Sequence, residues 1–165
     1  TQGVSSAASD VYKRQHLLGT WRGAGKGFYP TINDFEYNET LRISAVPNKP
    51  FFRYEQRTTS PDGAPMHQEL GYIRFLGGDE VEFVLAQPTG QAEALFGFIS
   101  DATPSNCTLT FQDSTVVNTP TAKQVDRTGR FLRVEGDSLH TEFYMAAVGQ
   151  PVGQHLQSEL TRDRG

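Results

Sequence analysis

The chain has 165 residues, the usual size of a single domain, and 36% of them are hydrophobic. No apolar run approaches the roughly 18 residues of a membrane-spanning helix, and the net charge of −4 with dispersed Lys and Arg argues against nucleic acid as a partner. The single cysteine, Cys107, excludes an intramolecular disulfide and a cysteine-based metal site, and it favours a cytoplasmic location.

The first segment lacks both an initiator Met and the apolar stretch of a signal peptide. It looks like translated adapter sequence, and the alternative is a native tail that is disordered or forms a short helix. We therefore expect residues 1–15 to be a disordered or non-native leader. Residues 16–165 are expected to form the one domain.

From Leu17 onward, short runs rich in Phe, Tyr, Val, Thr and Ile are separated by turn residues such as those at 61–63 and 135–137. Several runs alternate as half-buried strands do, for example Leu41 and Ile43 with polar neighbours. This spacing predicts ten strands, near residues 19–29, 35–46, 50–60, 67–77, 80–88, 91–100, 107–118, 125–136, 138–148 and 155–163.

No helical periodicity follows Leu18, so crossover helices and a parallel sheet are not expected. Ten consecutive strands leave unpaired sheet edges unless the sheet closes on itself. We therefore predict an all-β fold, a ten-stranded antiparallel up-and-down barrel, in preference to a sandwich. A barrel wider than about eight strands can hold a ligand cavity, which makes a small-molecule site the first hypothesis.

Aromatic residues dominate the interiors of such barrels whatever the ligand. Seven phenylalanines are therefore expected to form the core and the cavity wall: Phe52, Phe75, Phe83, Phe98, Phe111, Phe131 and Phe143.

The usual catalytic motifs are absent from the sequence. None of the four histidines has the spacing of a metal site, and there is no Gly-x-Ser-x-Gly motif. The glycine-rich run at residues 19–27 lacks the Gly-Lys-Ser/Thr ending of a phosphate-binding loop. Its structural interpretation is that Trp21 packs across the barrel floor while the glycines allow close backbone approach.

The same run carries a family resemblance. Gly19, Trp21, Gly23 and Gly25 match the Gly-x-Trp-x-Gly-x-Gly motif of the nitrobindin family, and Tyr29-Pro30-Thr31-Ile32 follows at the family's position. Further matches extend the resemblance over about residues 17–162, at Pro65-Met66-His67-Gln68-Glu69, Gly71-Tyr72-Ile73-Arg74, Pro120-Thr121-Ala122-Lys123, Met145-Ala146-Ala147-Val148-Gly149-Gln150-Pro151 and His155-Leu156.

The resemblance implies a barrel similar to fatty-acid-binding proteins that holds one haem b per chain. His155 matches the family's axial ligand to the haem iron, and Thr31 and Lys123 match positions expected near the haem, with Lys123 as a partner for a propionate. The family's activity implies isomerisation of peroxynitrite to nitrate at ferric haem and binding of nitric oxide at ferrous haem. Small molecules are thus the expected partners, and both a monomer and a homodimer remain open.

The histidines also have interpretations that do not depend on the family. Simple alternation places His155 opposite Leu156 and Leu160, so if His155 points inward, these leucines should point outward unless a β-bulge intervenes. His67 is either a hydrogen-bonded histidine at a strand end or a group near the haem edge. His140 is expected to face solvent.

Two other classes of function compete with a haem enzyme. A carrier of a lipid or small hydrophobic ligand would share the barrel, and Gly-x-Trp near the first strand is also a feature of lipocalin-like barrels. A carrier would not need His155. A structural or interaction barrel without a ligand agrees with the composition but does not account for the motifs.

Overall fold

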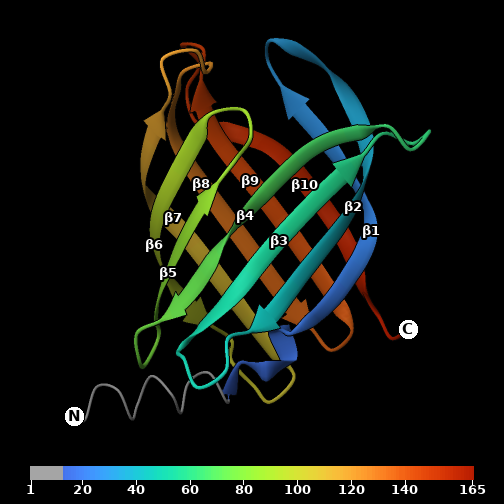
Figure 1. Ribbon diagram of the computed structural model, residues 1–165, viewed down its shortest axis with the longest axis vertical. Coiled ribbons are helices and arrows are strands. Elements are labelled where there is room, and N and C mark those ends of the chain that lie inside the picture. Colours follow the sequence, from blue (N-terminus) through green and yellow to red (C-terminus); the bar gives the residue numbers. More distant parts are fainter. Residues whose placement is uncertain (1–12) are drawn as a thin grey trace.

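A computed structural model describes residues 13–165 as one closed barrel (Figure 1). Its elements in chain order are the 3-10 helix η1 (Gln15–Leu17) and the strands β1 (Gly19–Tyr29), β2 (Ile32–Ala45), β3 (Phe51–Thr59), β4 (Pro65–Phe75), β5 (Glu80–Ala86), β6 (Gln91–Ser100), β7 (Asn106–Asn118), β8 (Val125–Glu135), β9 (Ser138–Ala147) and β10 (Gly153–Asp163).

Every strand pairs antiparallel with the next one along the chain, and β10 returns to pair with β1. The predicted ten-stranded antiparallel barrel is therefore confirmed. Four strands, β2, β4, β7 and β10, begin one to three residues earlier than the turn residues suggested. The β1–β2 hairpin continues to a Tyr29–Ile32 pair, and β10 begins at Gly153, which pairs with Met145.

The apolar core fills one end of the barrel, beside η1. Trp21 is fully buried there, and its Nε1 donates a hydrogen bond to the carbonyl oxygen of Leu17 at 3.1 Å. The prediction that Trp21 packs across the barrel floor is confirmed. The motif glycines serve the same packing: a Cβ on Gly23 would collide with the backbone oxygen of Glu159, and one on Gly25 would collide with the ring of Tyr37.

The predicted aromatic interior is largely present. Phe52, Phe75, Phe83 and Phe111 are buried in the core, and Phe143 is half-buried and lines a cavity. Phe131 is also half-buried, but it alternates with the inward Arg130 and Leu132, and its ring packs against Arg133 and His140. The prediction for Phe98 is wrong, because its side chain is 56% exposed. Alternation along β6 turns Phe98 outward, where its ring packs on Phe96.

The prediction for residues 1–15 falls mostly outside the described residues, which begin at residue 13, and it stays a prediction. Within the described part, Arg14 and Leu17 are buried. No helix among residues 13–165 is long and apolar enough to cross a membrane.

Candidate functional site

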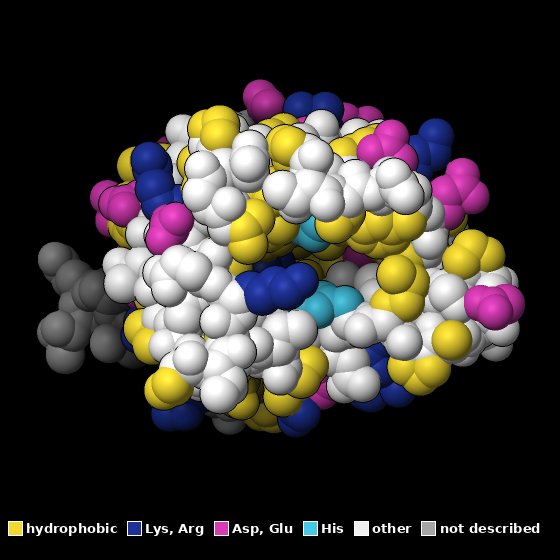
Figure 2. Space-filling view, turned by 90° about the horizontal axis from the view of Figure 1, so that it is seen from above, with side chains coloured by type: hydrophobic (Ala, Val, Ile, Leu, Met, Phe, Trp, Pro, Cys, Tyr) yellow, Lys and Arg dark blue, Asp and Glu magenta, His cyan; other side chains and the backbone are white. Residues whose placement is uncertain are grey.

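The end of the barrel opposite η1 contains a cavity of about 620 Å³. Viewed onto this open end, the molecule is hollowed, with histidine and Lys or Arg side chains at the mouth (Figure 2). Cavities that hold drug-sized ligands measure about 300–1,000 Å³. The predicted ligand cavity is thus present at a useful size.

His155 reaches this cavity through a β-bulge in β10. Tyr144 pairs with Gln154 and Phe143 pairs with Leu156, so His155 has no partner of its own on β9. The extra residue shifts the alternation, and both His155 and Leu156 line the cavity. This irregularity removes the conflict between an inward His155 and its leucine neighbour.

The imidazole of His155 is held in one orientation. Its Nδ1 lies 2.7 Å from the backbone oxygen of Phe28, which can only accept, so Nδ1 carries the hydrogen and Nε2 keeps its lone pair. The rings of Tyr29, Phe35 and Phe143 surround it edge-on, with centroids 5.6–6.2 Å away. Burial lowers the pKa of His155, which favours the neutral form that binds metals.

Thr31 and Lys123 lie at the mouth of the same cavity. Thr31 stands in the turn between β1 and β2, and Lys123 stands in the turn between β7 and β8. Both are exposed, and the backbone oxygen of Lys123 accepts a hydrogen bond from Gln91 at 2.9 Å. The structure therefore brings the three sequence-predicted residues, His155, Thr31 and Lys123, to one cavity from distant parts of the chain.

The motif residues Gly19, Trp21, Gly23 and Gly25 do not line the cavity. They belong to the packing of β1 and of the closed end. They support the site indirectly, because their packing stabilises the barrel that encloses the cavity.

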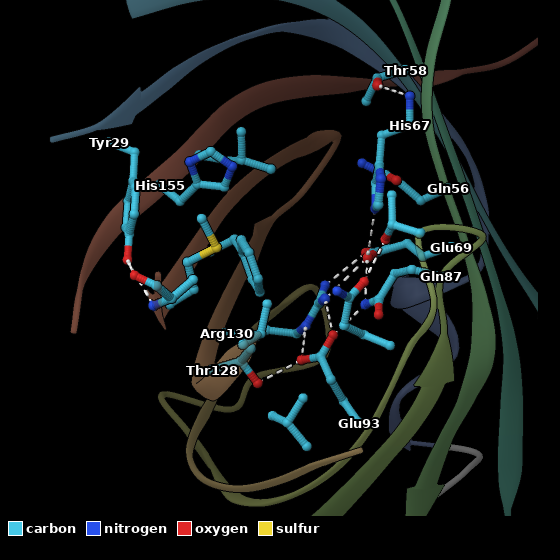
Figure 3. A pocket seen from close by; sticks show the side chains of 18 of the residues that line it. Tyr29, Gln56, Thr58, His67, Glu69, Gln87, Glu93, Thr128, Arg130 and His155 are labelled. Atoms are coloured by element: carbon cyan, nitrogen blue, oxygen red, sulfur yellow. Dashed lines mark hydrogen bonds and ion pairs between the residues drawn. The ribbon is translucent and has the colours of Figure 1, made fainter. Parts of the chain in front are cut away.

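Of the other two histidines considered, His67 lies in the cavity and His140 lies outside it. His67 lines the cavity across from His155, and its Nε2 lies 3.5 Å from Glu69 Oε2 (Figure 3). Its backbone N–H donates to Thr58 Oγ1 at 3.0 Å near the start of β4, which agrees with the hydrogen-bonded interpretation. The interpretation of His67 as a group near the haem edge stays a prediction. His140 lies off the cavity, where it contacts Glu142 and Glu159, and its ring is only partly exposed.

The bottom of the cavity is polar, which sequence analysis missed. We call this hydrogen-bonded group of inward side chains the polar floor; it consists of Glu39, Gln56, Glu69, Gln87, Glu93, Thr128, Arg130 and Ser158. A signal was available in the alternation of the strands. Glu93 has the same parity as Leu95, and Arg130 the same parity as Leu132, so both had to point inward.

Arg130 is the centre of the polar floor (Figure 3). Its guanidinium binds Glu69 through two bonds of 2.6 and 3.0 Å and Glu93 through two bonds of 2.6 and 3.2 Å. Burial alone would raise the pKa of Glu69, but Arg130 outweighs it and holds that pKa well below the usual range. Burial would lower the pKa of Arg130, and the two carboxylates raise it instead.

Glu39 is a third buried carboxyl group, without an ion pair among the described residues. Its Oε1 accepts hydrogen bonds from Gln56 Nε2 at 3.1 Å and Ser158 Oγ at 3.0 Å. Burial raises the pKa of Glu39 to about 7, because these neutral donors compensate only part of the desolvation of the charged form.

Among residues 13–165, no group of three or more His, Cys, Asp or Glu side chains is arranged to hold a metal ion directly. Haem iron is different, since a single histidine holds it in several haem protein classes. Cys107 does not serve as a ligand at this site: it is buried in the core, and burial raises the pKa of its thiol to about 11.

Comparison with known proteins identifies the family. Residues 10–162 match the THAP4-like, heme-binding beta-barrel domain. The chain belongs to this family. Haem is therefore the cofactor of this domain, and the family resemblance inferred from the motifs is confirmed.

Close relatives cover almost the whole chain. A peroxynitrite isomerase of Nocardia farcinica is 43% identical over 155 residues, which is 93% of this chain and 91% of the relative. Peroxynitrite isomerase 2 of Mycobacterium avium is 42% identical over 149 residues, 90% of this chain and 91% of the relative. The crystal structure of Rv2717c from M. tuberculosis superposes with a TM-score of 0.88 at 40% identity, covering 96% of this chain and 98% of that chain.

Proposed function

We propose that the chain binds one haem b in its cavity, with Nε2 of His155 as the axial ligand, and that it isomerises peroxynitrite to nitrate. The observation that carries this proposal is the hydrogen bond from His155 Nδ1 to the carbonyl oxygen of Phe28. It fixes the tautomer and leaves the metal-binding nitrogen free at an otherwise aromatic wall. The activity of the peroxynitrite isomerases to which the chain is similar supports the reaction.

The residues of the cavity fit a haem. Phe35, Phe143 and Leu156 provide apolar contacts around His155 for the flat macrocycle. The polar floor carries net negative charge, which disfavours carboxylates at the bottom. The propionates are therefore expected at the mouth, where Lys123 supplies a positive charge and Thr31 a hydroxyl group.

The chain contributes positioning and exclusion of water to the reaction. When bound, haem would supply the iron at which peroxynitrite is isomerised in the ferric form and nitric oxide is bound in the ferrous form. Peroxynitrite and nitrate have the same atoms and the same charge, so the reaction requires no net proton transfer to the protein. This agrees with a site in which the free imidazole nitrogen is the essential group and the apolar walls keep bulk water away.

The proposed location is the cytoplasm. The support is that Cys107, the single cysteine of the sequence, is a buried free thiol. A fold without a disulfide does not depend on an oxidising compartment.

A titration of the apo-protein with hemin tests the ligand. The wild-type protein should give a saturable Soret band at one equivalent of hemin, and His155→Ala should lose this band while its far-ultraviolet spectrum stays that of a folded barrel. His140→Ala is the matched control, because His140 lies off the cavity, and it should behave as wild type. The same band in His155→Ala would show that another group binds the iron.

The activity follows as a second measurement. Peroxynitrite should decay faster with the ferric wild-type protein than with the apo-protein, and nitrate should be the product. A carrier of hydrophobic ligands would give no saturable band with hemin and no acceleration.

A further inference from the structure

A guanidinium group at the bottom of an apolar cavity is well suited to hold an acid. Arginine binds carboxylates through two parallel hydrogen bonds, and such bonds are strongest away from water. Arg130 is buried beneath a cavity of about 620 Å³ whose upper wall is aromatic. With free donors, it would anchor amphiphilic carboxylates, such as fatty acids, with their acid group inward and their chain toward the mouth.

Four of the five N–H donors of Arg130 are already taken, however. Glu69 accepts hydrogen bonds from the two terminal nitrogens, Nη1 and Nη2. Glu93 accepts hydrogen bonds from Nε and Nη2. These two carboxylates are fixed in turn, because Tyr54 donates to Glu69 at 2.9 Å and Thr128 donates to Glu93 at 2.6 Å. A carboxylate that entered from the cavity would have to displace a buried and fully hydrogen-bonded partner.

The charges oppose such a ligand as well. Two carboxylates surround one guanidinium, so this group has a net charge of about −1 when both are ionised, and Arg130 keeps the pKa of Glu69 low. In a buried region of low dielectric constant, an additional anion is repelled more strongly than in water.

Stability alone is a weak reason to bury these ions. Removing charges from water costs several kcal/mol per ion, and apolar residues of similar volume often stabilise a core as well or better. A role in selecting ligands accounts for the arrangement more directly.

We infer that Glu69 and Glu93 are specificity-determining residues, which occupy Arg130 and thereby keep amphiphilic carboxylates out of the cavity. The inference concerns which ligands the cavity refuses, so it goes beyond the proposed function. It rests on the ion pairs of the polar floor and not on ligation by His155.

The test compares two ligands of equal chain length with the haem-free protein at a pH of about 8, where a carboxylic acid is ionised. Octanoate and octanol are titrated separately, and the ratio of their affinities is measured by calorimetry. The wild-type protein should bind octanoate more weakly than octanol. In Glu93→Gln and in Glu69→Gln, which keep the side-chain shape, the ratio should move toward octanoate by about 10-fold or more.

Two further variants separate this role from a general change of the cavity. Adding Arg130→Met to Glu93→Gln should abolish the gain, because the anchor is lost. Glu39→Gln removes a buried carboxyl group that makes no hydrogen bond to Arg130, and it should change the ratio much less.

Unchanged ratios in the folded Gln variants would overturn the inference. Octanoate binding to the wild-type protein as tight as octanol binding would overturn it too, and this comparison decides the question even where both Gln variants fail to fold. Because no hemin is present, a negative result leaves the proposed haem site untouched. A failed hemin titration would likewise leave this inference standing.

Discussion

The guanidinium of Arg162 stacks on the indole of Trp21, with its Cζ 4.2 Å from the ring centroid. The same guanidinium binds Asp137 at 3.0 Å and the backbone oxygen of His16 at 2.6 Å. One arginine of the last strand therefore connects the first strand, the 3-10 helix and the β8–β9 turn. This contact closes the barrel at the end opposite the cavity.

Replacing Trp21 should consequently destabilise the whole barrel. Trp21→Ala removes a fully buried side chain and should lower the free energy of unfolding by about 3–5 kcal/mol. Denaturant unfolding followed by far-ultraviolet circular dichroism measures this change. Trp21→Phe, which keeps an aromatic ring under Arg162, should lose less, and an unchanged midpoint in Trp21→Ala would contradict the packing role.

Breaking the buried ion pairs should also be costly. Arg130→Met leaves Glu69 and Glu93 unpaired in the interior and should destabilise the protein by about 3–5 kcal/mol. Adding Glu69→Gln and Glu93→Gln to the same chain should restore much of the loss, since no uncompensated charge remains. Thermal unfolding of the single and triple variants tests this, and equal melting temperatures would show that the charges are not the cause.

Glu39 should make stability depend on pH. Burial raises its pKa from the ordinary 4.5 to about 7, so the folded protein keeps a proton that the unfolded chain releases. The resulting stabilisation is complete below the unfolded pKa and is lost as the pH rises through about 7, by an amount on the order of 3 kcal/mol.

Glu39→Gln imitates the protonated acid and should remove this dependence. Its free energy of unfolding should exceed that of wild type at a pH of about 8 and change less from about pH 5 to about pH 8. Chemical unfolding at a series of pH values provides the measurement. Parallel pH profiles for the two proteins would show that Glu39 does not titrate in this range.

Lys123 should contribute to haem affinity by its charge. Lys123→Ala should weaken hemin binding by less than about 10-fold, because the side chain is exposed and the interaction is screened. The loss should shrink as salt is added, and Lys49→Ala, in the β2–β3 turn at the closed end, serves as the control. A loss that is independent of salt would rule out an ion pair with a propionate.

Much of the fold was decided by local sequence features. Alternation such as Leu41 and Ile43, with turn residues at regular intervals, determined the number of strands and most of their limits. Closure followed from the need to satisfy the sheet edges. The error at Phe98 arose from treating its aromatic character as a sign of burial, although the parity of its strand turned it outward.

The candidate site was only partly predictable. The motifs singled out His155, Thr31 and Lys123, but alternation spoke against an inward His155. A β-bulge depends on how two strands pair, which one strand's sequence does not specify, so only the paired β9 and β10 resolve its direction.

The sequence by itself determined the strands, the barrel and the family, because these depend on periodicity and on residues that match in order along one chain. Only the tertiary structure decided the tautomer of His155 and the polar floor. A hydrogen bond from His155 to Phe28 spans 127 positions, and the bonds from Arg130 to Glu69 span 61. Such partners are chosen by the closure and register of the barrel, and these exist only once all ten strands have paired.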